Sequence, residues 1–244
     1  MTAKRYLTVA LATAATLAAG PLIASQSCTD DAMLVFDGSG SMSEVGFNLL
    51  DEPRIFEARR AVHDSLPQIA AIRHVGLVIY GPGQPEACGN IQLRFAPRPN
   101  AAGPIIDAVE HLQPAGETPL TRAVERAAEV LNYREEPGVI VLLTDGKETC
   151  EGQPCALATE LASEAHDLTV HVIGFKVRDD HFGWDDPQDN GYERRVTVAR
   201  CLADQTGGTY APAETLDELT EALTRTLGCQ LIGRLPDMQS HRPS

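Results

Sequence analysis

The stretch AMLVFDGSGS, residues 32–41, decides the fold. Its first five residues are an uninterrupted apolar run bounded by turn residues, a pattern typical of a buried parallel strand. Directly after this run the chain turns on two glycines and presents the carboxylate of Asp37 and the hydroxyls of Ser39 and Ser41. Oxygen donors at the open end of a strand suit Mg²⁺, Mn²⁺ or Ca²⁺, and they suit zinc or copper poorly.

Two later segments place further oxygen donors beside the ends of predicted elements. Residues 116–120 read GETPL, contain Thr118 and come immediately before a predicted helix. Residues 139–146 read VIVLLTDG, a second buried apolar run that ends on Asp145 and a glycine. The carboxyl ends of the strands in an open α/β sheet converge on one crevice. We therefore expect these donors to meet those that follow the first strand.

Together the three segments resemble the metal-ion-dependent adhesion site (MIDAS) of the von Willebrand factor A domain family. The family pattern is DxSxS, then a Thr, then an Asp, and every position has its match in this chain. The matching residues are Asp37, Ser39, Ser41, Thr118 and Asp145. The resemblance covers about residues 30–228. The run TDGKETC at 144–150, followed by Cys155, is similar to the bacterial exported type of the family.

The resemblance implies a doubly wound, mostly parallel, six-stranded α/β sheet with helices on both faces, a Rossmann-like arrangement. It also implies that Ser39 and Ser41 bind a divalent ion directly, that Thr118 joins them in the ligand-bound form, and that the two aspartates act mostly through water. One coordination position is then left for an acidic residue of a partner protein. Mg²⁺, which prefers six oxygens and retains waters, fits this donor set, with Mn²⁺ or Ca²⁺ as alternatives. Few direct anionic ligands leave such an ion electrophilic.

Alternating strand and helix patterns predict one α/β domain over residues 29–229. Strands are expected near 32–36, 75–80, 91–95, 138–143, 168–175 and 209–211. Helices are expected near 54–66, 102–111, 120–132, 193–204 and 216–227, with another starting near residue 155. The 91–95 segment alternates as an edge strand does, and we expect Pro97 and Pro99 to end it. The polar tail, 230–244, is expected to lie outside the domain.

The N-terminus has the pattern of a secretory signal peptide. Lys4 and Arg5 precede an apolar stretch from Tyr6 to Ala24, and small residues follow. We expect residues 1–24 to be removed and the mature protein to be periplasmic or secreted, with no transmembrane segment. Because the removed segment holds two cations and no acidic residue, the net charge moves from −14 to −16. This charge argues against nucleic acid and anionic membranes as partners.

Six cysteines in an exported chain predict disulfides. Cys28 precedes the first strand and Cys229 follows the last helix. The two ends of a domain often lie close together, so we expect these two cysteines to pair.

Two arrangements remain for the other four cysteines. The local one joins Cys150 to Cys155 and leaves Cys88 to reach Cys201 across the sheet, which is poor geometry. The other joins Cys88 to Cys150 and Cys155 to Cys201, and we favour it. Metal binding by these thiols is disfavoured, because they form no CxxC pair.

The segment 178–191 is rich in aspartate and contains Phe182 and Trp184, the only tryptophan of the chain. It follows a predicted strand, so it is expected on the same face as the metal site. The two aromatic residues are therefore candidate contacts for a partner. The aspartates lack the spacing of a calcium-binding loop, which favours a surface insertion over a second metal site.

The sequence favours a metal-dependent protein-binding module that recognises an acidic group on its partner. One alternative is a metal-dependent hydrolase whose ion activates water. Another is a scaffold in which the ion is only structural. The nearest candidates for a general base are Glu117 and Glu148, and no nucleophile–base pair accompanies the three segments. We therefore expect the protein not to be an enzyme.

Overall fold

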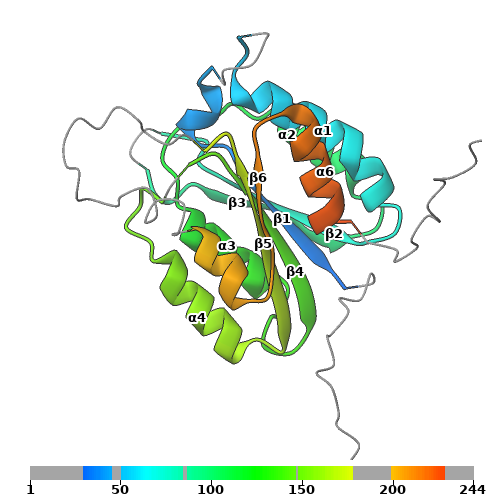
Figure 1. The fold of residues 1–244 in the computed structure, drawn as a ribbon, viewed down its shortest axis with the longest axis vertical. Coiled ribbons are helices and arrows are strands. Elements are labelled where there is room, and N and C mark those ends of the chain that lie inside the picture. Colours follow the sequence, from blue (N-terminus) through cyan, green and yellow to red (C-terminus); the bar gives the residue numbers. More distant parts are fainter. Residues whose placement is uncertain (1–29, 46–50, 85–86, 147, 178–198, 229–244) are drawn as a thin grey trace, which may run out of the picture.

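The computed structural model describes residues 30–45, 51–84, 87–146, 148–177 and 199–228, which form one sheet with helices on both faces (Figure 1). The strands are β1 (Ala32–Asp37), β2 (Val75–Tyr80), β3 (Ile91–Arg98), β4 (Pro137–Thr144), β5 (Asp167–Phe175) and β6 (Tyr210–Ala213). The helices are α1 (Arg54–Ile69), α2 (Ala102–Glu110), α3 (Leu120–Val130), α4 (Pro154–Glu164), α6 (Leu216–Thr226) and the 3-10 turn η1 (Gly40–Ser43). Residues 199–205 are also helical, and the first part of the helix predicted near 193–204 lies outside the described residues.

The six strands lie in the order β3-β2-β1-β4-β5-β6. β1 pairs in parallel with both β2 and β4, and β5 and β6 continue the parallel arrangement, whereas β3 is antiparallel to β2. The predicted doubly wound, mostly parallel six-stranded sheet is therefore confirmed. The chain leaves β1 toward β2 and later returns to its other side as β4, so the strand order reverses at β1. Ligands of open α/β sheets bind in the crevice at such a point.

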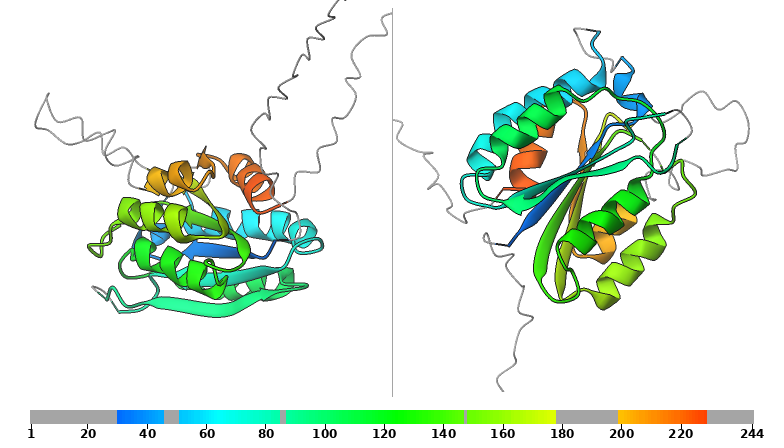
Figure 2. Two further views of the ribbon diagram at one scale, coloured as in Figure 1. Left: turned by 90° about the horizontal axis from the view of Figure 1, so that it is seen from below. Right: turned by 180° about the vertical axis from the view of Figure 1, so that it is seen from behind.

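The hydrophobic core lies on both sides of the sheet. Leu34 and Phe36 of β1 belong to the cluster that packs under α1, α2 and α6. Met33 and Val35 alternate with them and join the cluster under α3, α4 and the helical residues 199–205. Figure 2 shows the two helical layers on opposite faces of the sheet. Because both faces of β1 are buried, its sequence is a continuous apolar run rather than an alternating one.

Strand β3 continues through Pro97 to Arg98, so the prediction that Pro97 ends it is wrong. β3 is the edge strand, and its pairing with β2 is irregular between Val75 and Leu77. Proline is tolerated at edges and bulges because its missing N–H removes no ladder bond there. Gly76 of β2 also permits β3 to pass close to it at Pro97, since a Cβ on residue 76 would lie 2.8 Å from the Pro97 nitrogen.

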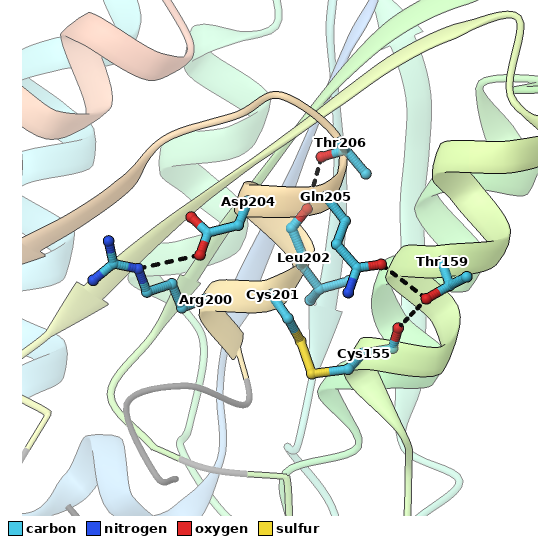
Figure 3. The surroundings of a disulfide bond; sticks show 8 residues. All are labelled: Cys155, Thr159, Arg200, Cys201, Leu202, Asp204, Gln205 and Thr206. Atoms are coloured by element: carbon cyan, nitrogen blue, oxygen red, sulfur yellow. Dashed lines mark hydrogen bonds and ion pairs between the residues drawn. A yellow bond between two sulfur atoms is a disulfide. The ribbon is translucent and has the colours of Figure 1, made fainter. Parts of the chain in front are cut away.

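Two disulfides link segments that are far apart in the sequence, the first between two loops and the second between two helices. Cys88 bonds to Cys150 and Cys155 bonds to Cys201, which confirms the favoured arrangement over the local one. The second disulfide ties the first turn of α4 to the helical residues 199–205, where the Thr159 hydroxyl also donates to Gln205 Oε1 at 2.8 Å (Figure 3). The four bonded cysteines leave no free thiol in the part of the chain that the structure describes.

The two ends of the described domain lie at the same edge of the sheet. The N–H of Ala32, at the start of β1, donates to the carbonyl of His74 at 3.0 Å. The neighbouring Arg73 donates to the carbonyl of Leu227, just after α6, at 3.1 Å. The predicted Cys28–Cys229 pair itself lies outside the described residues. Among the helices that are described, none has the length and apolar character needed to cross a bilayer.

Candidate metal centre

The DxSxS turn leaves β1 at the reversal point of the sheet and is shaped by its neighbours. The N–H of Gly38 donates to the carbonyl of Tyr80 at the end of β2, at 2.8 Å. Gly81 follows with φ +97°, a conformation that side chains rarely adopt, and a Cβ on it would lie 2.5 Å from the Cα of Ser39. The turn can therefore pack against the β2 end only because residue 81 has no side chain.

The same turn is bonded to the segment that carries Thr118. The N–H of Gly40 donates to the Gly116 carbonyl, and the N–H of Ala115 donates to the Gly38 carbonyl, both at 3.0 Å. Thr118 lies two residues beyond this contact and is buried. The fold thus brings together segments that are about 80 residues apart in the sequence.

Asp37 is fully buried and receives donors on both carboxylate oxygens. Its Oδ1 accepts from the N–H and the hydroxyl of Ser39, at 2.9 and 2.6 Å. Its Oδ2 accepts from the Tyr80 hydroxyl at 2.7 Å and from the Thr144 hydroxyl at 2.9 Å. These donors stabilise the ionised carboxylate and hold it in one orientation. Asp37 therefore positions the Ser39 hydroxyl rather than pointing freely into the crevice.

The hydroxyls of Ser39 and Ser41 lie side by side, with their oxygens 3.0 Å apart. Ser41 donates its proton to Asp145 Oδ1 at 2.6 Å, which leaves its oxygen lone pairs for another partner. Adjacent ligands of an octahedral Mg²⁺ ion lie about 2.9 Å apart, and those of Ca²⁺ lie about 3.5 Å apart. The spacing of the two hydroxyls is that of an ordinary hydrogen bond, and it is also compatible with two neighbouring positions of an octahedral Mg²⁺ ion.

A buried arginine completes the site. Arg54, the first residue of α1, is 3% exposed. Its Nη1 donates to Asp145 Oδ2 at 3.0 Å and to the Ser41 carbonyl at 2.9 Å. The same nitrogen lies 3.4 Å from a carboxylate oxygen of Glu44, whose side chain is largely exposed. One guanidinium thus links the DxSxS turn to the second aspartate.

The two carboxylates favour a positive charge between them. Burial first, and then the neighbouring Asp37 carboxylate, raise the pKa of Asp145 to about 7, although Ser41 and Arg54 oppose the shift. Burial, and then Asp37, also raise the pKa of Tyr80 well above its usual value, so its hydroxyl stays protonated and donates. A divalent cation would relieve the repulsion between the aspartates, which is the electrostatic setting of a metal site.

The Thr118 loop is braced by the segment that follows β4. The Thr118 N–H donates to the Thr149 hydroxyl oxygen at 2.8 Å, and the Thr149 N–H donates to the Thr118 carbonyl at 3.2 Å. Glu148 accepts from the N–H of Thr121, in the first turn of α3, and from the N–H of Cys150, both at 2.8 Å. Glu148 therefore caps a helix and holds a loop.

Three residues of this site were not predicted from the sequence, namely Arg54, Tyr80 and Thr144. Thr144 directly precedes Asp145 and Tyr80 ends an apolar strand, so their positions at strand ends were a usable signal. Arg54 has no such signal, because its contact with Asp145 spans 91 residues. The candidate partner contacts Phe182 and Trp184 lie outside the described residues.

No cluster of three or more His, Cys, Asp or Glu side chains that could hold a metal occurs within the described ranges. The candidate metal site rests instead on the hydroxyls of Ser39 and Ser41, which lie together at the end of β1 beside the carboxylates of Asp37 and Asp145. Hydroxyl and carboxylate oxygens are hard donors, and they suit Mg²⁺ or Mn²⁺ better than softer ions.

Comparison with known proteins agrees with this architecture. Residues 32–148 match the von Willebrand factor type A domain. The uncharacterized protein YwmD of Bacillus subtilis (strain 168) is 26% identical over 214 residues, which cover 84% of this chain and 88% of that protein.

Two solved structures share the fold. The pilus adhesin SpaC from Lactobacillus rhamnosus GG aligns with a TM-score of 0.60 and 15% identity, over 83% of this chain and 31% of that chain. Proximal thread matrix protein 1 from the mussel byssus, with a zinc-occupied MIDAS motif, aligns with a TM-score of 0.52 and 18% identity, over 82% of this chain and 46% of that chain. This chain thus spans less than half the length of either, and the likeness at such identities concerns the fold.

Proposed function

Because the chain belongs to the von Willebrand factor type A domain family, we propose that it is an exported module that binds a partner protein through a divalent metal ion. The ion would be held by the five matching residues of the crevice, Asp37, Ser39, Ser41, Thr118 and Asp145. An acidic residue of the partner would complete its coordination. Mg²⁺ is the proposed ion, and Mn²⁺ and Ca²⁺ are the alternatives.

This proposal rests on the hydroxyl oxygens of Ser39 and Ser41, which lie 3.0 Å from each other and beside two buried carboxylates. The carboxylates already bind donors from the protein, so neutral hydroxyls are the groups left to ligate an ion directly. An ion held mainly by neutral ligands keeps most of its charge and attracts an anionic ligand. The zinc in the MIDAS motif of the byssus protein supports a divalent ion here, and competition between Zn²⁺ and Mg²⁺ would identify the preferred one.

A binding role is proposed over a hydrolase because Glu148, one of the two nearest candidates for a general base, is engaged in hydrogen bonds of its own. Both oxygens of Glu148 accept backbone N–H groups. Metal-assisted hydrolysis needs a water beside the ion and a group to take its proton. A scaffold with a purely structural ion is the second alternative, and the capture experiment described below distinguishes it from a binding module.

Export is proposed from the signal-peptide pattern and from the two disulfides among the described residues, since disulfides persist in oxidising compartments. The shared fold with a pilus adhesin is in keeping with a role outside the cytoplasm. The partner would be a protein, and the acidic character of the chain argues against nucleic acid.

The test is capture of partners from an extract of exported proteins with the mature domain as bait. Wild type would be compared in Mg²⁺ and in chelator, and with Asp37→Ala and Thr118→Ala in Mg²⁺. A protein retained only by the Mg²⁺-loaded wild type would support the proposal. Retention that is equal in every arm, or none at all, would count against it. Ser39→Ala that loses thermal stability and keeps full capture would favour the scaffold.

A further inference from the structure

We propose that Arg54 is a built-in counter-ion of the metal site, which stabilises the metal-free protein and lowers its affinity for the divalent ion. Arg54 would act as a positioning residue and not as a ligand. This inference rests on the proposed function, because it assumes that the crevice binds a divalent ion.

The contacts of Arg54 place its charge inside the site. Its Nη1 lies 3.0 Å from Asp145 Oδ2 and 2.9 Å from the Ser41 carbonyl, and the side chain is buried. Asp145 Oδ1, on the other side of that carboxylate, accepts from Ser41. The aspartate is therefore held between a hydroxyl that faces the proposed ion and a guanidinium that faces away from water.

The formal charge of the site follows from these contacts. With both carboxylates ionised, as beside a bound cation, Asp37 and Asp145 contribute two negative charges, and Arg54 reduces the sum over these three buried groups to minus one. The largely exposed Glu44 is not counted. A divalent ion would then leave the loaded site with one positive charge, whereas without Arg54 it would be neutral. A surplus positive charge is what an acidic ligand of a partner would recognise.

The same charge opposes the entry of the ion. Charges repel more strongly in a buried site than in water, because the effective dielectric constant is lower there. Without the ion, however, Arg54 compensates a buried carboxylate that would otherwise be costly. Arg54 thus stabilises the metal-free state and destabilises the metal-bound state, whereas a purely structural residue would stabilise both.

Helix α1 has a second buried anchor, which makes the effect of replacing Arg54 interpretable. Glu57, one turn further along α1, forms an ion pair with Lys176 at the end of β5, and both are buried. Replacement of Arg54 would therefore leave the start of α1 attached to the carboxyl end of the sheet.

The experiment is calorimetric titration of Mg²⁺ into the metal-free mature protein, together with its thermal stability in chelator. Arg54→Met removes the charge and keeps much of the apolar stem. We expect it to bind Mg²⁺ about tenfold more tightly, because the repulsion is lost. We also expect it to melt at a lower temperature in chelator and to gain more from Mg²⁺ than wild type. Arg54→Lys should stay within about threefold of the wild-type affinity, because it keeps the charge.

Arg73→Met is the matched control. Arg73 is equally buried, but it donates to the Leu227 carbonyl at the opposite edge of the sheet. Its replacement should lower the melting temperature and leave the Mg²⁺ affinity unchanged. Arg54→Gln serves where Arg54→Met does not fold in chelator, and it should shift the affinity in the same direction.

Mg²⁺ affinity that falls together with stability in Arg54→Met, or that does not change, would overturn the inference and make Arg54 a structural residue. Failure of metal binding, on which both the proposed function and this inference rest, gives a different result, since the wild type would then bind no Mg²⁺ and the comparison among the variants would show stability effects alone.

Discussion

The backbone N–H of Thr118 donates to the side-chain oxygen of Thr149 at 2.8 Å, and the Thr149 N–H returns a bond to the Thr118 carbonyl at 3.2 Å. The next residue, Cys150, is bonded to Cys88 in the loop between β2 and β3. The candidate metal-binding threonine is thus braced by a disulfide that no part of the MIDAS pattern contains.

Replacing both Cys88 and Cys150 by alanine should therefore weaken Mg²⁺ binding as well as the fold. The bridge closes a loop of 62 residues, which stabilises the folded chain by about 4 kcal/mol in the chain-entropy description. Its loss frees the segment that holds Thr118. Urea unfolding and Mg²⁺ titration of the double variant measure the two effects.

The Cys155–Cys201 pair provides the matched control. It closes a loop of 46 residues, so its removal should cost about the same stability. It lies between α4 and the helical residues 199–205, and we expect its double alanine variant to keep the wild-type Mg²⁺ affinity. Equal affinity losses in the two double variants would show that destabilisation alone, and not the brace on Thr118, explains the effect.

Gly81→Ala should damage the DxSxS turn directly. The added Cβ would meet the backbone of Ser39 at 2.5 Å, at a residue whose φ is +97°, and neither the backbone nor this conformation yields cheaply. We expect a loss of a few kcal/mol, roughly 2 to 4, in the free energy of unfolding, together with weaker Mg²⁺ binding.

Gly103→Ala tests the same substitution where nothing lies within 4 Å of the new Cβ. Gly103 lies in α2, and alanine there should raise the free energy of unfolding by up to about 1 kcal/mol without changing metal binding. A stable Gly81→Ala variant with normal Mg²⁺ affinity would mean that the turn tolerates a side chain at residue 81.

Tyr80→Phe should show how far Asp37 depends on its donors. The change removes the bond from the Tyr80 hydroxyl to Asp37 Oδ2, at 2.7 Å in a fully buried position. A hydrogen bond to a charged group contributes about 1.5–3 kcal/mol, so the metal-free protein should lose that much stability. Tyr133→Phe is the control, because its hydroxyl reaches the half-exposed Glu160 at 3.3 Å, and it should cost less and leave Mg²⁺ binding intact.

The parallel strands could be predicted from the sequence because they depend on local signals, and the five candidate site positions were chosen from the turns that follow the predicted elements. Each of β1 and β4 contains a run of five apolar residues; β1 ends on Asp37, and β4 is followed directly by Asp145. The edge strand was predicted only to residue 95. Its course through Pro97 depends on the space above Gly76, a contact between two strands that no local pattern records.

The contacts between the buried side chains of the site could not be predicted from the sequence, for the same reason. Arg54 begins a helix in an ordinary amphipathic pattern, and its role follows from a contact with Asp145 across the fold. The pairing of the cysteines could be favoured from the sequence, because the expected arrangement of the strands makes some pairs geometrically poor. The observed pairs are Cys88 with Cys150 and Cys155 with Cys201.

His171 should make the fold sensitive to acid. It lies in β5, 7% exposed, and its Nδ1 accepts from the Thr209 N–H at 3.0 Å, which places the ring proton on Nε2. Burial, and then Arg73, lower the pKa of His171 to about 4 from 6.5. Between these values the unfolded chain binds a proton that the folded protein does not. The contribution is therefore fully present above pH 6.5 and is lost as the pH falls toward 4, by about 3 kcal/mol in all.

His171→Asn should remove this loss, because the amide oxygen can still accept from Thr209 and the side chain does not titrate. Urea unfolding at pH 7 and pH 4.5, in chelator, measures how much free energy of unfolding the wild type and the variant each lose in acid. Both proteins contain the same carboxylates, so the contribution of these groups drops out when the two losses are compared. The wild type should lose about 2 to 3 kcal/mol more than the variant. His63→Asn, at an exposed histidine of α1, should lose as much as wild type. An acid loss that is the same in His171→Asn as in wild type would assign the effect to other groups.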